Sequence, residues 1–253
     1  MRKYLTLAAT ALLIAGCGET QTPNSGETQQ VAGAPASSAD SNDASQDSRT
    51  ESGAASATPA AAPALGGRTG ELVNPDNNTM VFLYYHLAGI APPIDNWVEE
   101  DSRVKYAPGL EKASKRTAIR AELESGAAAV RDVGFIRLSM NANLSEYDPT
   151  YGEFLVRALA PSSVVSFDSL GQKVELKFGN GRTAQIWRVP QSQAQAIRDK
   201  IGQYGNVSLD VLLRIASILP GPGGGTITTD VVEYEMQTSQ GGLTVARVQV
   251  AQQ

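Results

Sequence analysis

The sequence predicts an α+β fold in which N-terminal helices are followed by a mainly antiparallel sheet of hairpins. Three observations lead to this prediction. Apolar residues recur at helical spacing after residue 76 and again over residues 108–131. Most of the chain beyond residue 135 instead alternates apolar and polar side chains with a period of two. Short turns separate the alternating segments, and helices followed by closely spaced strands favour an antiparallel sheet.

Three helices are expected, in order along the chain. The first follows the capping sequence Asp76-Asn77-Asn78-Thr79 and stops at Gly89. The second covers about residues 108–131, where strong helix formers predominate, and it could begin near Ser102. The third follows Pro190, with apolar residues along one face. Residues 90–96, which include two consecutive prolines, are expected to form a loop. Trp97 is expected in a polar loop, where it either covers the open face of the sheet or is exposed.

The strands are expected where apolar and polar residues alternate. The dipeptide Asn180-Gly181 between two alternating segments predicts a tight hairpin. The last strand changes its apolar phase at Ala246-Arg247, which indicates a bulge. The glycine-rich segment 221–226 lacks the Lys and Ser/Thr of a phosphate-binding loop and is expected to be a flexible hairpin loop. The expected strands cover residues 136–144, 174–178, 182–189, 207–215, 232–236 and 243–250.

The first sixteen residues are expected to form a secretory signal peptide. Two basic residues precede an apolar segment of 13 residues, residues 4–16, which is too short to remain as a spanning helix. Its end, Leu13-Ile14-Ala15-Gly16-Cys17, resembles the lipobox of bacterial lipoproteins. The resemblance implies cleavage between Gly16 and Cys17 and a lipid on the thiol of Cys17, which is the membrane anchor. In Gram-negative lipoproteins, Asp directly after the lipidated Cys resembles a retention signal for the inner membrane. The residue here is Gly18, so the resemblance implies an outer-membrane location facing the periplasm, in a cell that has an outer membrane.

Residues 17–69 are expected to be a disordered tether that carries this lipid. Residues 18–69 are mostly Ala, Ser, Thr, Gly, Pro, Gln, Asn and Asp, with no aromatic residue. Such a segment buries too little apolar surface to offset its chain entropy. Residues 70–253 contain both Trp residues and are expected to fold as one globular domain, which is large enough to need no disulfide.

Composition excludes several classes of function. The chain has 21 Lys and Arg against 26 Asp and Glu, and this acidic balance argues against binding to nucleic acid. One Cys excludes an internal disulfide and multi-Cys zinc or iron–sulfur sites, and one His excludes motifs that need two. We therefore expect no cofactor and no metal. No stretch of the sequence reaches 18 apolar residues, the length of an ordinary membrane-spanning helix.

A short motif resembles a family of uncharacterised bacterial exported proteins. The segment Phe135–Leu138 begins a strand that ends in Leu144-Ser145-Glu146-Tyr147-Asp148, and Phe154 follows six residues after the Asp. The resemblance covers roughly residues 76–253 and implies a fold unit and an envelope location, but no reaction. From the residues alone, Tyr147-Asp148-Pro149 is a turn in which Asp caps the backbone and Pro restricts φ. Tyr147 and Asp148 are also weak ligand candidates.

Few residues in the sequence point to a particular chemical function. His86 lies within an apolar helix and is interpreted as a hydrogen-bonded structural residue; a metal site there would need carboxylates such as Asp95, Glu99 or Glu100. Trp97, if exposed, would be a further weak candidate, as an anchor for a partner. No catalytic residue is nominated.

The sequence therefore predicts a lipid-anchored envelope lipoprotein that is not an enzyme but a binding or scaffolding module for an envelope protein or cell-wall partner. Two alternatives stay open. The first is an envelope hydrolase that uses carboxylates or His86. The second is a periplasmic carrier of lipids or small molecules, with an apolar cavity between sheet and helices.

Overall fold

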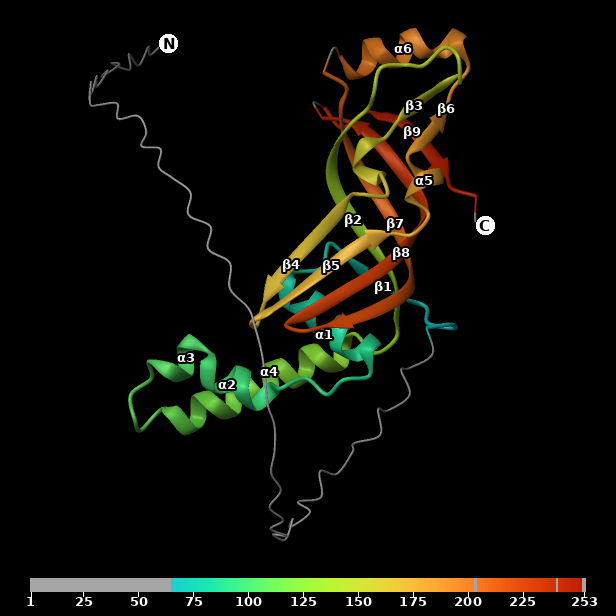
Figure 1. Ribbon diagram of the computed structural model, residues 1–253. Helices are drawn as coiled ribbons and strands as arrows, with labels where there is room; N and C mark the ends of the chain where they lie inside the picture. Colours follow the sequence, from blue (N-terminus) through green and yellow to red (C-terminus); the bar gives the residue numbers. More distant parts are fainter. Residues whose placement is uncertain (1–64, 203, 240, 252–253) are drawn as a thin grey trace, which may run out of the picture. The chain divides into compact units, whose positions relative to one another are not determined.

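The computed structural model describes residues 65–202, 204–239 and 241–251 (Figure 1). The expected signal peptide, Cys17 and residues 18–64 of the expected tether lie outside the described residues. Within the described residues, no helix has the length and apolar character that crossing a membrane requires.

Seven strands form one mixed sheet, in the order β1-β2-β7-β8-β5-β4, with β9 also paired to β8. The predicted α+β class is confirmed, but the sheet is not a simple series of hairpins. The ladders β1/β2 and β5/β8 are parallel, whereas β2/β7, β7/β8, β8/β9 and β4/β5 are antiparallel. The seven strands are β1 (Gly70–Val73), β2 (Val133–Asn143), β4 (Val164–Ser169), β5 (Gln172–Phe178), β7 (Asn206–Gly221), β8 (Gly224–Thr238) and β9 (Thr244–Gln249).

Four helices connect β1 to its parallel neighbour β2, because parallel strands need a long crossover. The first helix has the predicted ends: Asp76 accepts a hydrogen bond from the backbone N of Thr79 at 2.7 Å, and Gly89 adopts a left-handed conformation. The prediction missed β1, which places a strand ahead of the helices. The four helices are α1 (Asn77–Ala88), α2 (Ile94–Glu100), α3 (Ser102–Lys105) and α4 (Lys112–Ala129).

The loop expected at residues 90–96 is wrong in its second half, where α2 begins at Ile94. Pro93 stands at its N-cap, and proline is tolerated there because the first turn has no internal partner for its N–H. The helix expected over 108–131 is confirmed as α4, which starts later, at Lys112. The segment near Ser102 forms the separate one-turn helix α3.

The hairpin expected at Asn180-Gly181 is wrong. Strand β5 ends at Phe178, α5 (Gly181–Ala184) follows, and β6 (Ile186–Arg188) pairs with β3 (Glu153–Leu155) in a separate two-stranded sheet. The Asn180 side chain instead bonds to the backbone of Val231 on β8. These tertiary contacts prevail over the local preference of Asn-Gly for a tight turn.

The glycine-rich segment 221–226 contains a hairpin turn, as predicted; residues 221–223 are exposed, whereas Gly224 is buried. Strand β7 runs to Gly221 and β8 starts at Gly224, so that only Pro222 and Gly223 connect them. Gly224 is buried with φ 139°, and its carbonyl accepts a hydrogen bond from the Tyr84 hydroxyl at 2.7 Å. The hairpin end is therefore attached to α1.

The bulge predicted in the last strand is confirmed one residue before the expected dipeptide. Met236 of β8 pairs with Ala246, whereas Gln237 pairs with Thr244, so Val245 is the additional residue. The third expected helix is confirmed as α6 (Gln191–Ile201).

The core lies between α1 and one face of the large sheet. Met80, Val81, Leu83 and Leu87 of α1 are fully buried, and α1 contacts β4, β5, β7 and β8. The inward positions of β7 and β8 alternate with polar outward ones, which is the pattern that the sequence shows.

Tyr234 is buried in this core, and its hydroxyl has no hydrogen-bond partner among the described residues. Burial raises the pKa of Tyr234. We expect Tyr234→Phe to leave the free energy of unfolding unchanged or to raise it by up to about 1 kcal/mol, because an unsatisfied hydroxyl is removed. Tyr84→Phe is the matched comparison, and we expect it to lose about 1–2 kcal/mol because its hydroxyl bonds to Gly224. Urea denaturation of both variants tests this, and a larger loss in Tyr234→Phe would contradict it.

Candidate functional site

Strand β9 has one free edge, and this edge is the starting point of the candidate site. It pairs with β8 alone. The backbone N of Val250 donates to Val232 at 2.9 Å, so the alternating hydrogen-bonded positions on β9 are Val248 and Ala246. The backbone groups of Arg247 and Gln249 therefore point away from β8. No other described residue pairs with them as a strand would.

One edge of β8 pairs with β7, the other edge pairs with β5 and then with β9, and Asn180 lies between these two strands. The N-terminal half of β8 pairs with β5, and its C-terminal half pairs with β9. Between them, the Asn180 amide N donates to the carbonyl of Val231 at 2.9 Å, and its oxygen accepts from the Val231 N at 2.8 Å. The Asn180 side chain thus provides hydrogen-bond partners for the backbone N–H and C=O of Val231, which pair with neither β5 nor β9. Helix α5 starts directly after Asn180.

A groove separates β9 from β6 and α6. It consists of two adjoining hollows of about 590 and 550 Å³, which share Trp187, Arg188 and Arg247. We call it the β6–β9 groove. Figure 1 shows β6, β9 and α6 at the same end of the large sheet. The other residues that line the β6–β9 groove are Arg182, Thr183, Ile186, Val189, Pro190, Ser192, Gln193, Ala196, Ile197, Lys200, Val245, Ala246, Val248 and Gln249.

The groove is basic. Arg182, Arg188, Lys200 and Arg247 line it, and no carboxylate does. Arg182 and Lys200 form no ion pair with any residue that the structure describes. Arg188 lies 3.9 Å from Glu153, and its side chain is 80% exposed. The local potential therefore favours an anionic occupant.

Arg247 is held over the groove by Glu235 of β8, at 2.7 Å. Hydrogen bonds from Thr244 and Gln237, together with the charge of Arg247, hold the pKa of Glu235 below its ordinary value. The carboxylate therefore stays ionised at neutral pH. The Arg247 side chain remains 79% exposed and free to contact a ligand.

The floor near β6 is rigid because its aromatic residues stack. Trp187 is 9% exposed and lies 5.5 Å from Phe154 in a stacked arrangement. Phe154 also contacts Tyr147, with ring centroids 5.1 Å apart. The groove residues come from segments distant in sequence, so sequence reasoning missed them; the phase change at Arg247 was the only local signal.

The weak ligand candidates Tyr147 and Asp148 lie in the turn before β3. The Tyr147 hydroxyl donates to the carbonyl of Val189 at 2.8 Å, and Asp148 accepts hydrogen bonds from the backbone N of Thr150 and Tyr151. Both side chains are thus engaged in holding the turn against the strand that leads to α6.

Trp97 does not lie in a loop, so that expectation is wrong. It belongs to α2, is 4% exposed, and packs edge-on against Tyr85 at 5.3 Å and Phe82 at 6.0 Å. Because its ring is enclosed by α1 residues, Trp97 is a core residue and not an exposed anchor.

His86 lines a pocket of about 500 Å³ between α1, α2 and α4, together with Glu124 and Arg131. Its Nε2 donates to the carbonyl of Arg131 at 2.9 Å. Two of the three carboxylates proposed for a metal site at His86 are engaged elsewhere: Asp95 pairs with Arg120, and Glu99 pairs with Arg116. Within the described ranges, no three His, Cys, Asp or Glu side chains form a group suited to a metal ion.

Desolvation, with the nearby charges of Arg68 and Arg131, lowers the pKa of His86 below 6.5. In the unfolded chain His86 binds a proton more readily, so folding stability falls as the pH drops through 6.5. We expect the unfolding free energy to decrease between about pH 7.5 and about pH 5.5, and the His86→Gln variant to lose this dependence. Urea titrations at both pH values measure it. An equally steep dependence in His86→Gln would show that another group is responsible.

The outward face of the sheet carries a second polar hollow, of about 280 Å³. Arg137 contacts Asp210 at 2.8 Å and Glu71 at 2.7 Å, and these two carboxylates raise the pKa of Arg137. Asp210 and Glu235 stand opposite each other on β7 and β8, but each has its own arginine. The charges of this face are therefore matched internally, whereas Arg182 and Lys200 of the β6–β9 groove form no ion pair with any described residue.

No protein family, curated protein or solved structure matches this chain.

Proposed function

We propose that this chain is a lipid-anchored lipoprotein of the cell envelope and that its domain is a non-enzymatic binding module. The β6–β9 groove is the binding surface, and its occupant is an extended polypeptide strand that carries carboxylates. The observation on which this depends is the unpaired edge of β9 beside four basic side chains with no lining carboxylate. The lipid on Cys17 and the tether let the domain reach a partner in the periplasm, and Gly18 favours the outer membrane.

An extended strand fits this edge for two physical reasons. Backbone hydrogen bonds to the free N–H and C=O groups of Arg247 and Gln249 extend the sheet by one strand, which is a recurrent mode of peptide recognition. Carboxylates at alternate positions of the strand then face Arg182, Arg188 or Lys200, which adds charge-assisted contacts. The stacked Trp187 limits movement of β6, so little ordering is required on binding.

Peptide binding tests the groove. Fluorescence anisotropy of a labelled peptide that alternates Val or Thr with Glu is measured against the purified chain in detergent. We expect binding to weaken at least about tenfold in the double variant Arg182→Gln/Arg188→Gln, which corresponds to about 1.4 kcal/mol. Arg157→Gln, at an exposed arginine outside the groove, is the matched control.

Two modified peptides separate strand addition from simple charge attraction. N-methylation at alternate residues removes backbone donors without changing charge, and we expect it to abolish binding. Replacement of Glu by Lys should abolish it as well. Equal binding of the N-methylated peptide would rule out strand addition, and equal loss in Arg157→Gln would show that the groove is not the site.

The anchor has its own test. Labelled fatty acid is expected to enter the chain in cells and to be absent from Cys17→Ser. Incorporation that survives this substitution would disprove the lipoprotein assignment without affecting the groove.

The hydrolase alternative depends on the pocket of His86. A His86→Gln protein that is folded and correctly localised, yet behaves in cells like a deletion, would favour that alternative over the binding module.

A further inference from the structure

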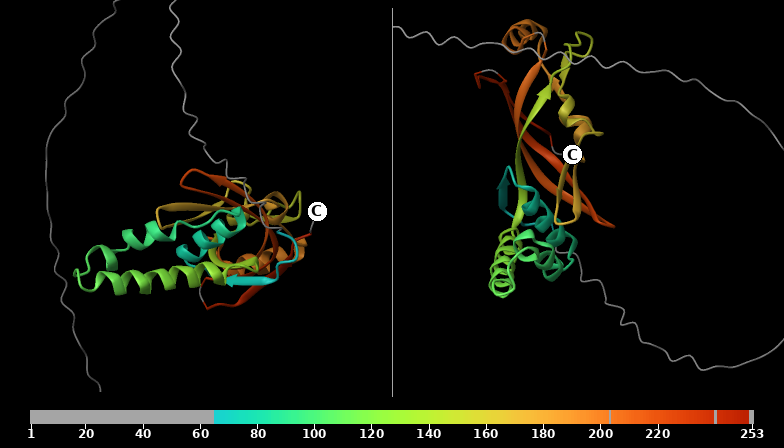
Figure 2. Two further views of the ribbon diagram at one scale, coloured as in Figure 1. Left: turned by 90° about the horizontal axis from the view of Figure 1, so that it is seen from below. Right: turned by 90° about the vertical axis from the view of Figure 1, so that its left-hand side faces the viewer.

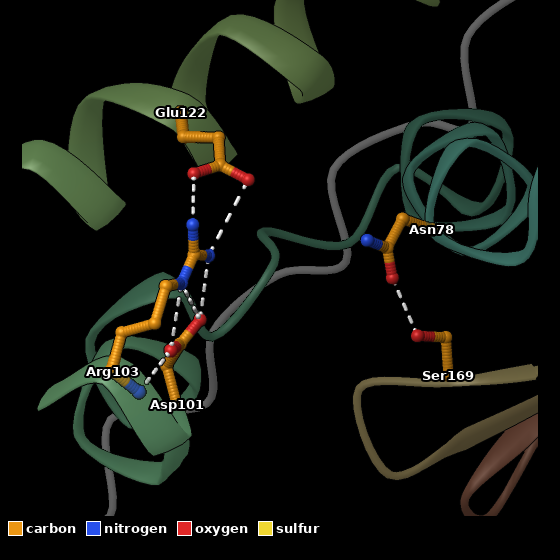
Figure 3. Close-up of polar contacts among 5 residues, drawn as sticks. All are labelled: Asn78, Asp101, Arg103, Glu122 and Ser169. Carbon is orange, nitrogen blue, oxygen red and sulfur yellow. Dashed lines mark hydrogen bonds and ion pairs between the residues drawn. The ribbon is translucent and has the colours of Figure 1, made fainter. Parts of the chain in front are cut away.

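Helices α2, α3 and α4 form an arm that extends away from the large sheet, as Figure 1 and the left view of Figure 2 show. Ion pairs join its two sides. Arg116 contacts Glu99 at 2.6 Å, and Arg103 contacts both Asp101 and Glu122 at 2.8 Å (Figure 3). The far end of the arm is the connection between α3 and α4, which we call the arm tip and which comprises Tyr106–Leu110.

The arm tip exposes two large apolar side chains. Leu110 is 100% exposed and Tyr106 is 77% exposed, the highest values among the large apolar side chains that the structure describes. No packing within the described domain covers them. Removal of this apolar surface from water is favourable, so the tip is suited to an apolar surrounding that the domain itself does not supply.

Basic residues flank the two apolar ones in the sequence. Residues 103–116 include five basic residues and a single acidic one. Lys105, Lys112 and Lys115 form no ion pair with other described residues, whereas Arg103 and Arg116 are paired within the arm. The Lys105 Nζ lies 5.9 Å from the centroid of the Tyr106 ring. Three lysine side chains are thus available to anions at the level of the tip.

We infer that the arm tip inserts into the surface of a bilayer that contains anionic phospholipid. Leu110 and the ring of Tyr106 enter the boundary between headgroups and acyl chains, where an aromatic side chain with a polar end is stable. The long stems of Lys105, Lys112 and Lys115 allow their ammonium groups to reach lipid phosphates.

A bilayer suits this tip better than a protein partner does. The tip is a short, protruding connection, whereas a stable protein interface needs a much larger complementary area. A fluid bilayer adapts to a protruding shape and supplies negative charge on all sides. Two apolar side chains give weak insertion by themselves, and attachment of the chain to the same bilayer raises the effective concentration of the tip. The inference does not use the β6–β9 groove.

Fluorescence at the tip tests the inference in the full chain. Gly109→Cys provides a labelling position, because a Cβ at Gly109 meets no atom within 4 Å. The chain is reconstituted into vesicles and labelled with an environment-sensitive fluorophore, and the unsubstituted chain is treated identically to correct for any reaction at Cys17. With phosphatidylglycerol present, we expect a blue shift and quenching by a lipid-attached quencher. Vesicles of phosphatidylcholine alone should give neither.

Three comparisons locate the effect. Leu243→Cys places the same label at another exposed apolar position, in the β8–β9 connection, and we expect no quenching there. In the Gly109→Cys background, Leu110→Ser/Tyr106→Ser and the triple change of Lys105, Lys112 and Lys115 to Gln should each reduce quenching to the level seen at residue 243. Absence of quenching at residue 109, equal quenching at residue 243, or persistence in both tip variants would overturn the inference.

Discussion

Gly224→Ala is expected to lower the free energy of unfolding by about 4 kcal/mol or more, a large part of the stability of an ordinary domain. Gly224 has φ 139°, which side chains rarely adopt, and a Cβ there would lie 1.8 Å from the backbone oxygen of Lys173 on β5. The same residue pairs with Gly221 and accepts the hydrogen bond of Tyr84. Any shift that relieves the clash therefore disturbs β5, β7 and α1 together.

Two neighbouring glycines are matched controls for this substitution. Gly221 has no unusual φ, and its Cβ would be 3.5 Å from the nearest oxygen, so Gly221→Ala should change stability by less than about 0.5 kcal/mol. Gly223 has φ 71° in open space, so Gly223→Ala should cost about 1 kcal/mol from backbone strain alone. Urea denaturation followed by circular dichroism measures all three. Similar losses at residues 223 and 224 would contradict the close approach of β5.

Asn180→Ala is expected to cost about 2–3 kcal/mol, because it leaves the backbone N–H and C=O of the buried Val231 without partners. The exposed Asn141 on β2 forms no side-chain hydrogen bond with any described residue, and Asn141→Ala should change stability by less than about 0.5 kcal/mol. Because α5 follows Asn180 directly, we also expect Asn180→Ala to weaken peptide binding in the β6–β9 groove.

Asn180→Asp separates the two hydrogen bonds. A carboxylate still accepts from the Val231 N, but it faces the Val231 carbonyl without a proton to donate. Folding should therefore favour the protonated acid, and the stability deficit relative to the wild type should shrink as the pH is lowered through the pKa of that carboxyl. A deficit that does not change with pH would show that the donor to Val231 contributes little.

The local elements were predictable where neighbours in sequence determine them. The ends of α1 depend on Asp76 and Gly89, and the inward face of β7 follows from its period-two pattern. The helix α2 was not predictable in the same way, because Pro92 and Pro93 indicate a loop while Trp97 packs between Tyr85 and Phe82. Packing against α1 stabilises this short helix more than its own propensity does.

The candidate site was not predictable because its members meet only in the folded chain. Arg182, Arg188 and Arg247 lie in separate segments. The sequence pattern around each of them predicts only an ordinary solvent-exposed side chain. The unpaired edge of β9 is equally hidden, since a period of two identifies a strand without identifying its neighbours.

By itself, the sequence determined a lipobox-like motif at residues 13–17, the α+β class, helices α1, α4 and α6, and strands β2, β5, β7, β8 and β9, because these depend on residues a few positions apart. The tertiary structure alone decided that Asn180 bonds to Val231, 51 residues away, instead of turning a hairpin. It also decided that β5 runs parallel to β8 and leaves β9 with a free edge. The physical reason is that burial and backbone hydrogen bonding across the whole sheet outweigh the small preference of a dipeptide for one turn.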